Sequence, residues 1–198
     1  MTTFYLVRHA VHPLIEKVLV GRMDGVSLDL RGYEQAGRIA ARLAREDIDA
    51  VQSSPQKRAR QTAAPIAEAA GVPLEIVSAF DEVNLGEWTG KPFSALKDDP
   101  RWKEWNEHRG RARPPAGESM QELQRRVVNY LRALVRERPN GRIAIVSHAE
   151  PIRAAMMHAI GLPLDEFWKF KIKPGSVSIL KADPTGMDLL ALNQAVAA

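Results

Sequence analysis

The stretch Thr3-Phe4-Tyr5-Leu6-Val7-Arg8-His9-Ala10 decides how the rest of the sequence is interpreted. Its run of apolar residues is typical of a strand that is buried on both faces, as in a parallel sheet. The strand then ends on a guanidinium and an imidazole. Two polar side chains are costly to bury at a strand tip unless something of complementary charge meets them there. The sequence therefore predicts that an anion binds where this strand ends.

The same arrangement occurs a second time, at residues 142–149, which read RIAIVSHA. This second strand ends at His148, as the first ends at His9. Ligands of open α/β sheets gather outside the carboxyl ends of the strands. We therefore expect the two histidines to lie within a few ångströms of each other, although either one alone could equally be a hydrogen-bonded structural residue.

Composition is that of an ordinary globular protein, with 198 residues, 45% apolar, 26% charged and a net charge of +4. The length favours one domain over residues 1–198. The chain has no cysteine, which excludes disulfides and thiolate chemistry and fits the cytoplasm. We expect no membrane contact, because no apolar run is long enough to span one. We expect no nucleic-acid partner either, because aromatic and basic residues are not interleaved as such proteins require.

The remaining elements alternate, which predicts an α/β domain of three layers, with helices on both sides of a mostly parallel sheet. Asp29 is expected to cap a helix over 30–45 that buries Tyr33, and Ser54-Pro55 to begin another. Ser119 opens a capping box before a long amphipathic helix. The other expected elements are strands at 49–53, 74–77 and 176–181, the last being the final core strand, and a helix at 151–160. Residues 84–117 are expected to be an irregular insertion over the active site.

Two further segments carry side chains suited to phosphate chemistry. Arg58 lies on the first turn of a predicted helix, where the unpaired N–H groups already favour anions. Residues 80–90, FDEVNLGEWTG, offer Glu82 as a proton donor, with Glu87 as the second choice. Each segment alone is more simply a solvated basic face or a surface loop, so the interpretation depends on their combination.

In combination, the motifs resemble the histidine phosphatase superfamily, also called the phosphoglycerate mutase-like family. The resemblance runs from Tyr5 to about Ser178. It rests on motifs that stand in the family's order and spacing: LVRHA at 6–10, GRMDGVSLDLRGYEQA at 21–36, SSPQKRARQTA at 53–63, EVNLGEWTG at 82–90, PPAGES at 114–119 and VSHAEPIRA at 146–154.

The resemblance implies a metal-independent phosphomonoesterase that acts on a small phosphorylated metabolite and needs no cofactor. It makes His9 the nucleophile, which forms a phosphohistidine, and Glu82 the general acid. The residues that it implies around the phosphoryl group and substrate are Arg8, Arg58, His148, Gly21 and Arg22. His12 stands where many members carry Thr, and it either contacts the substrate or faces solvent. Trp102, Trp105 and Arg113 are further candidates for the substrate pocket, together with Arg22.

The local chemistry agrees with these roles. The surrounding cations should lower the pKa of His9 and keep its imidazole neutral enough to attack phosphorus. The same cations should keep Glu82 ionised, so that protonation of a leaving group would require mildly acidic pH.

This sequence departs from the family at two positions, and three other functions remain open. Many members carry Thr and Asn where this chain has His12 and Ile15, and isoleucine cannot hold phosphate as asparagine does. The alternatives are a cofactor-dependent phosphoglycerate mutase, a metallohydrolase that uses His9, His12 and His148, and a non-catalytic binder of phosphorylated ligands on the same fold. The sequence leaves the oligomeric state and the strand order undetermined.

Overall fold

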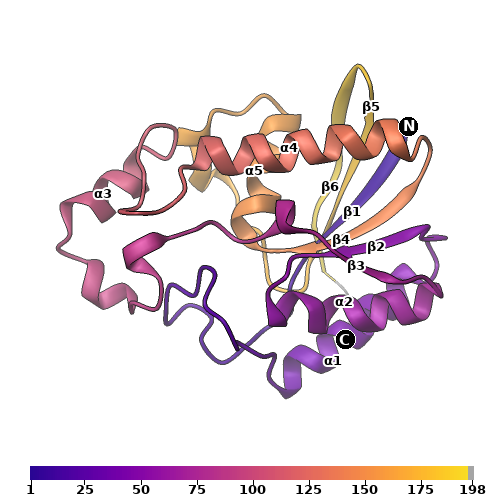
Figure 1. Ribbon diagram of the computed structural model, residues 1–198, viewed down its shortest axis with the longest axis horizontal. Coiled ribbons are helices and arrows are strands. Elements are labelled where there is room, and N and C mark those ends of the chain that lie inside the picture. The colour runs from indigo at the N-terminus through magenta and orange to yellow at the C-terminus, as the bar shows by residue number, and fades with distance from the viewer. Residues whose placement is uncertain (196–198) are drawn as a thin grey trace.

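The computed structural model describes residues 1–195 and places the predicted first strand, β1 (Thr2–Arg8), inside a six-stranded sheet of order β3-β2-β4-β1-β5-β6 (Figure 1). The last three residues of the expected domain lie outside the described part. β1 pairs in parallel with β4 (Arg142–Ser147) and antiparallel with β5 (Val177–Asp183). Both histidine-bearing strands are therefore neighbours, as their matching sequences suggested.

The sheet is mostly parallel, as predicted. β2 (Ala50–Ser53) pairs in parallel with both β4 and β3 (Leu74–Ile76). β6 (Gly186–Gln194) pairs antiparallel with β5 at the edge of the sheet and is not predicted from the sequence. Each of its residues is half-buried or exposed, and Leu190 is 58% exposed, so β5 remains the last strand of the core, as expected.

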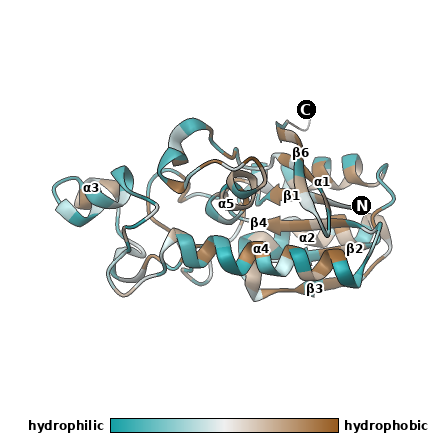
Figure 2. Cartoon of the chain, turned by 90° about the horizontal axis from the view of Figure 1, so that it is seen from above, coloured by the Kyte–Doolittle hydropathy of each residue, from teal (hydrophilic) through white to brown (hydrophobic). Residues whose placement is uncertain are grey.

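Helices cover both faces of the sheet, which gives the three layers that the sequence predicted. α1 (Leu30–Leu43) and α2 (Lys57–Ala70) lie on one face, and α4 (Met120–Glu137) and α5 (Ala149–Ala159) on the other (Figure 1). Alternate residues of β1 enter the two cores, with Phe4 and Leu6 facing α4 and α5, and Tyr5 and Val7 facing α1 and α2. The apolar colouring of the central strands in Figure 2 shows why the sheet must be covered twice.

The predicted helix starts are confirmed in two of three cases. Asp29 caps α1 by accepting a hydrogen bond from the Gly32 amide, and Ser119 forms a complete capping box at α4. α2, however, begins at Lys57, with Gln56 at the N-cap position, and not at Ser54. Ser54 is drawn into the active-site network described below, and the chain turns into a helix only after it.

Tyr33 does not lie on the buried face of α1, because 49% of it is exposed. Its hydroxyl accepts a hydrogen bond from the side chain of Gln61, on α2. The buried residues of α1 are instead Gly32, Ala36, Ile39, Ala40 and Leu43.

The insertion at residues 84–117 extends beyond one end of the sheet (Figure 1) and is not wholly irregular. It contains α3 (Pro100–Glu107). Asp99 caps the N-terminus of this helix by accepting a hydrogen bond from the Arg101 amide. It also contains two short 3-10 turns, at 86–88 and 93–96. Little in the sequence indicates α3, because this helix is short and buries one residue, Trp105.

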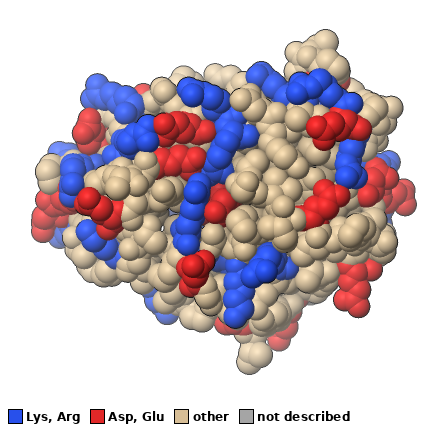
Figure 3. Space-filling model, in the orientation of Figure 1, with Lys and Arg blue, Asp and Glu red and all other residues tan. Residues whose placement is uncertain are grey.

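On the surface, Lys and Arg are interspersed with Asp and Glu over the face shown in Figure 3. Within residues 1–195, no helix is both long enough and apolar enough to cross a membrane.

Candidate active site

The carboxyl ends of β1, β2 and β4 meet at one edge of the sheet and bring the two predicted histidines together. The ring centroids of His9 and His148 lie 5.1 Å apart, which confirms the expected proximity. The His9 amide donates to the carbonyl of Ser147 over 2.9 Å, so the nucleophile candidate is tied directly to the neighbouring strand. The position of His9 is therefore fixed by the sheet and not by a loop.

His9 is buried, and its backbone neighbour sets its tautomer. Nδ1 lies 2.8 Å from the carbonyl oxygen of Ala10, which can only accept, so Nδ1 carries the proton. Nε2 is left with its lone pair. Burial lowers the pKa of His9 well below its ordinary value, and the charges of Arg58 and Arg8 lower it further. The predicted direction is confirmed, but desolvation is the larger cause.

His148 is the centre of a hydrogen-bond chain behind the cavity wall. Arg58 donates to its Nδ1 over 3.1 Å, so the proton of the neutral ring lies on Nε2, which donates to Ser54 Oγ over 2.7 Å. Ser54 in turn donates to Asp81 over 3.2 Å. Burial and the Arg58 charge lower the pKa of His148 well below its ordinary value. A neutral His148 is thus held between a cation and a serine.

Two arginines aim unsatisfied N–H groups at this edge of the sheet. Arg58 is 1% exposed and donates from Nη2 to the carbonyl of Gly21 over 2.7 Å. Arg8 donates from Nη1 to the carbonyl of Ile172 over 2.6 Å. The Nε and Nη1 atoms of Arg58 and the Nε of Arg8 are buried with no hydrogen-bond partner among residues 1–195. Buried guanidinium groups left in this way are costly, and a phosphoryl group would satisfy them.

Glu82 is 8% exposed and lies beside this cluster. Its Oε1 accepts from the Val83 amide over 2.8 Å, and its Oε2 lies 4.0 Å from His148 Nδ1. Burial, followed by the charge of Glu150, raises the pKa of Glu82 well above its ordinary value, despite opposing effects of the Val83 hydrogen bond and of the charges of Arg58 and Arg8. The expectation that nearby cations keep Glu82 ionised is therefore wrong, because they do not outweigh burial.

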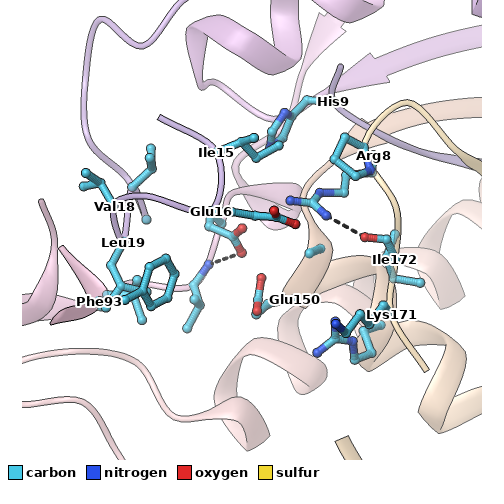
Figure 4. A pocket seen from close by; sticks show the side chains of 18 of the residues that line it. Arg8, His9, Ile15, Glu16, Val18, Leu19, Phe93, Glu150, Lys171 and Ile172 are labelled. Atoms are coloured by element: carbon cyan, nitrogen blue, oxygen red, sulfur yellow. Dashed lines mark hydrogen bonds between the residues drawn. The ribbon is translucent and has the colours of Figure 1, made fainter. Parts of the chain in front are cut away.

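A cavity of about 530 Å³ opens onto these residues. In Figure 4, Val18, Leu19 and Phe93 lie on one side of the cavity, and Arg8 and Lys171 lie on the opposite side, the charged wall, together with Ile172. Among the predicted site residues, those that line it are Arg8, His9, His12, Gly21, Arg58, Glu82, Trp102 and Trp105.

His12 is 4% exposed, and its ring centroid lies 5.3 Å from that of His9. Its Nδ1 accepts from the Leu14 amide, and burial, with the charges of Arg58 and Arg8, lowers its pKa to about 4. It therefore faces the cavity as a neutral ring and not the solvent.

Other predicted residues lie outside the cavity lining. Arg22 donates to the Glu82 carbonyl over 2.8 Å and to Glu118 over 3.1 Å, so it braces the loop that carries Glu82. Arg113 is exposed and paired with Glu122. Glu87, the second choice for the acid, is exposed and is not among the residues that line the cavity; its carboxylate lies 4.0 Å from the Arg101 guanidinium.

Sequence reasoning missed several residues of the site. Ser54 and Asp81 complete the network around His148, and Glu150, Arg153 and Arg109 line the charged wall. Glu150 and Arg153 could have been found, because they stand in the VSHAEPIRA motif on the first turns of the helix that follows His148. In the described part of the chain, no group of three or more His, Cys, Asp or Glu side chains could hold a metal ion, so the geometry gives the metallohydrolase alternative no support.

Comparison with known proteins places these observations in a family. Phosphoserine phosphatase 1 of Hydrogenobacter thermophilus is 31% identical over 98% of this chain and 92% of its own length. The adenosylcobalamin/alpha-ribazole phosphatase of Escherichia coli is 26% identical over 96% of this chain and 94% of its own.

Solved structures and a family model agree. The crystal structure of the alpha-ribazole phosphatase from Shigella flexneri superposes with a TM-score of 0.86 at 25% identity, covering 99% of this chain and 98% of that one. The model of the histidine phosphatase superfamily (branch 1) matches residues 4–195. Because this model covers nearly the whole chain, the chain belongs to the histidine phosphatase superfamily.

Proposed function

We propose that the protein is a phosphomonoesterase of small phosphorylated metabolites, in which His9 carries the phosphoryl group between two displacements. The observation that carries this proposal is the pairing of a neutral, tautomerically fixed His9 with buried arginine N–H groups that have no hydrogen-bond partner within residues 1–195. A nucleophile beside unsatisfied cations suits an incoming phosphoryl group and little else. The cytoplasm stays the expected compartment, since a chain without cysteine needs no oxidising environment.

In the first displacement, the Nε2 lone pair of His9 forms a bond to phosphorus as the bond from phosphorus to the leaving oxygen breaks. Arg8 and Arg58 stabilise the equatorial oxygens as their charge redistributes. Glu82, protonated because its pKa is raised, gives its proton to the leaving alkoxide. His148 acts from behind the wall by holding Arg58 in place.

In the second displacement, water attacks the phosphohistidine. Glu82, now a carboxylate, takes a proton from the water, and the phosphorus–nitrogen bond breaks. Phosphate leaves, and His9 and Glu82 return to their starting protonation states. Nothing in these steps requires a metal, because the two arginines supply the positive charge.

The test is phosphate release from p-nitrophenyl phosphate in the presence of a strong chelator, with wild type and His9→Ala compared. We expect turnover by the wild type and none by the variant. Equal turnover by both proteins, or loss of wild-type turnover in chelator, would overturn the proposal. Incubation with 3-phosphoglycerate separates the mutase alternative, which would give isomerisation in place of phosphate release.

A further inference from the structure

The first turns of α5 present opposite charges to the cavity, directly after His148. Glu150 and Arg153 both line the cavity, and their spacing of three places them on one face of the helix, with Cβ atoms about 5–6 Å apart. Among residues 1–195, no ion pair joins them. In Figure 4 the Glu150 carboxylate points into the cavity, between Arg8 and Lys171. Both side chains therefore face whatever fills the cavity beyond the phosphoryl site.

Arg153 is a buried cation with free donors. It is 5% exposed, and its Nε and Nη1 have no hydrogen-bond partner in the described part of the chain. Its guanidinium lies over Phe167, 3.8 Å from the ring centroid, which holds its plane in one orientation. Arg109 lies over the same ring at 4.2 Å, and its Nε likewise finds no hydrogen-bond partner among residues 1–195. Planar guanidinium donors of this kind match a carboxylate.

Glu150 lies within charge range of these cations and of the phosphoryl site. Its charge acts on Arg8 and Glu82, and also on Arg109 and Arg153. Its carboxylate accepts no hydrogen bond from residues 1–195. A half-buried carboxylate at this place repels a second anion and attracts a cation. The cavity thus places one carboxylate, that of Glu150, among the cations of the phosphoryl site and those that lie over Phe167.

We propose that Glu150 and Arg153 determine the specificity of the enzyme, and that its substrate is an O-phosphorylated α-amino acid. The ammonium of the substrate meets Glu150, and its carboxylate meets Arg153, with Arg109 beside it. The two substrate groups stand on one carbon, so a pair of oppositely charged side chains on one helix face can bind both. This inference rests on the proposed function, since it assumes that the phosphoryl group occupies the site at His9.

The test uses four phosphomonoesters that differ in these two groups. O-phosphoserine carries both, phosphoethanolamine lacks the carboxylate, 3-phosphooxypropionate lacks the ammonium, and p-nitrophenyl phosphate lacks both. For each enzyme, kcat/KM is expressed relative to that for p-nitrophenyl phosphate on the same preparation, which cancels any loss of folded protein. We expect O-phosphoserine to be preferred over each singly charged analogue by about 10- to 100-fold in wild type, as one charge-assisted contact allows.

Single substitutions test which side chain binds the ammonium of the substrate and which binds its carboxylate. Glu150→Gln should lower the relative kcat/KM of the two ammonium-bearing esters about 10-fold or more, and spare 3-phosphooxypropionate. Arg153→Gln should lower that of the two carboxylate-bearing esters and spare phosphoethanolamine. The exposed residues Glu68 and Arg60 on α2 supply matched controls, and Glu68→Gln and Arg60→Gln should change no ratio.

Two results would overturn the assignment, and they can be told apart. If p-nitrophenyl phosphate is hydrolysed through His9 but the ratios are the same in wild type and both cavity variants, the subsite is wrong and the proposed function stands. If no ester is hydrolysed by wild type, the proposed function fails and the subsite fails with it.

Discussion

The sheet edge and the insertion at residues 84–117 bound the same cavity but are built differently. At the sheet edge, His9 and His148 follow buried strands and are held by hydrogen bonds to Ala10, Arg58 and Ser54. The insertion is held by aromatic packing, with the ring centroid of Trp88 5.3 Å from that of Trp102 and 6.3 Å from that of Trp105. Hydrogen bonds demand fixed partners and angles, whereas apolar packing tolerates exchange of similar volumes. The difference suggests that the chemistry resides in the sheet and that the insertion shapes access.

The strongest test of this division removes the nucleophile. His9→Ala should lower kcat/KM for every phosphomonoester by about 10⁴-fold or more. His12, the other imidazole of residues 1–195 that lines the cavity, accepts a hydrogen bond at Nδ1 and so carries its proton on Nε2, which leaves it no free Nε2 lone pair. The measurement is steady-state phosphate release, together with acid-labile ³²P in the protein after rapid quenching. A variant that kept its labelled phosphoprotein would place the nucleophile elsewhere.

Glu82→Gln should have the next largest effect and should also change the pH dependence. With a poor alcohol leaving group, kcat should fall by about 10²- to 10⁴-fold, since the proton donor is lost. In wild type, kcat/KM should fall on the acid side as His9 becomes protonated, well below pH 6.5, and on the alkaline side as Glu82 loses its proton, well above pH 4.5.

The alkaline decline should vanish in Glu82→Gln. Glu87→Gln is the matched control, because Glu87 is an exposed glutamate of the same loop. If the two variants gave the same pH profile and rates, Glu82 would lose its role.

Within the insertion, Trp105→Ala should reduce stability more than it reduces the chemical step. Trp105 is 1% exposed, and Arg109 lies over its ring at 4.5 Å. Loss of a buried tryptophan costs about 3–5 kcal/mol of unfolding free energy. Urea denaturation measures this cost, and kinetics with a charged substrate should show a higher KM with a smaller change in kcat. A fall in kcat with unchanged KM would contradict the view that the insertion shapes access and takes no part in the chemistry.

Arg22→Ala should have the smallest effect and sharpens the boundary between the regions. Because Arg22 holds the backbone of Glu82 and not the cavity, kcat should fall by about 10-fold or less while KM changes little. Arg113→Ala, which removes an exposed arginine paired with Glu122, should change neither constant. A rise in KM with unchanged kcat for Arg22→Ala would instead indicate direct contact with substrate.

The regular part of the fold could be predicted from sequence because local signals decide it. The strands that carry His9 and His148 are runs of apolar residues. Asp29 and Ser119 are residue types that cap helix N-termini, and each does so in the structure. Edge strand β6 was not predicted, because three of its nine residues are exposed and the other six are only half-buried, unlike the buried inner strands. The helix after β2 begins at Lys57 and not at Ser54, because Ser54 is hydrogen-bonded to His148. No local sequence pattern reveals a contact between residues so distant in the chain.

The motifs of the candidate site could be predicted from the sequence. The outcome of competing interactions within the site could not. The direction of the pKa change at His9 followed from neighbouring cations, but the one at Glu82 did not, because burial and Glu150 outweigh those cations. Arg22 carries the right charge for a substrate contact, yet the acidic side chains of Asp81 and Glu118 engage it. Outcomes of this kind depend on competition between groups that are distant in sequence.

The position of β1 inside the sheet determines which property of the enzyme is lost last on denaturation. The amide of Arg8 donates to Ser176 and that of His9 to Ser147, so the strand end is held on both sides. Amides of this kind exchange with deuterium only when the whole domain opens, whereas a peripheral segment such as α3 can open by itself. During gentle denaturation, substrate discrimination should therefore decay before phosphoryl transfer does, and the enzyme should become promiscuous before it becomes inactive.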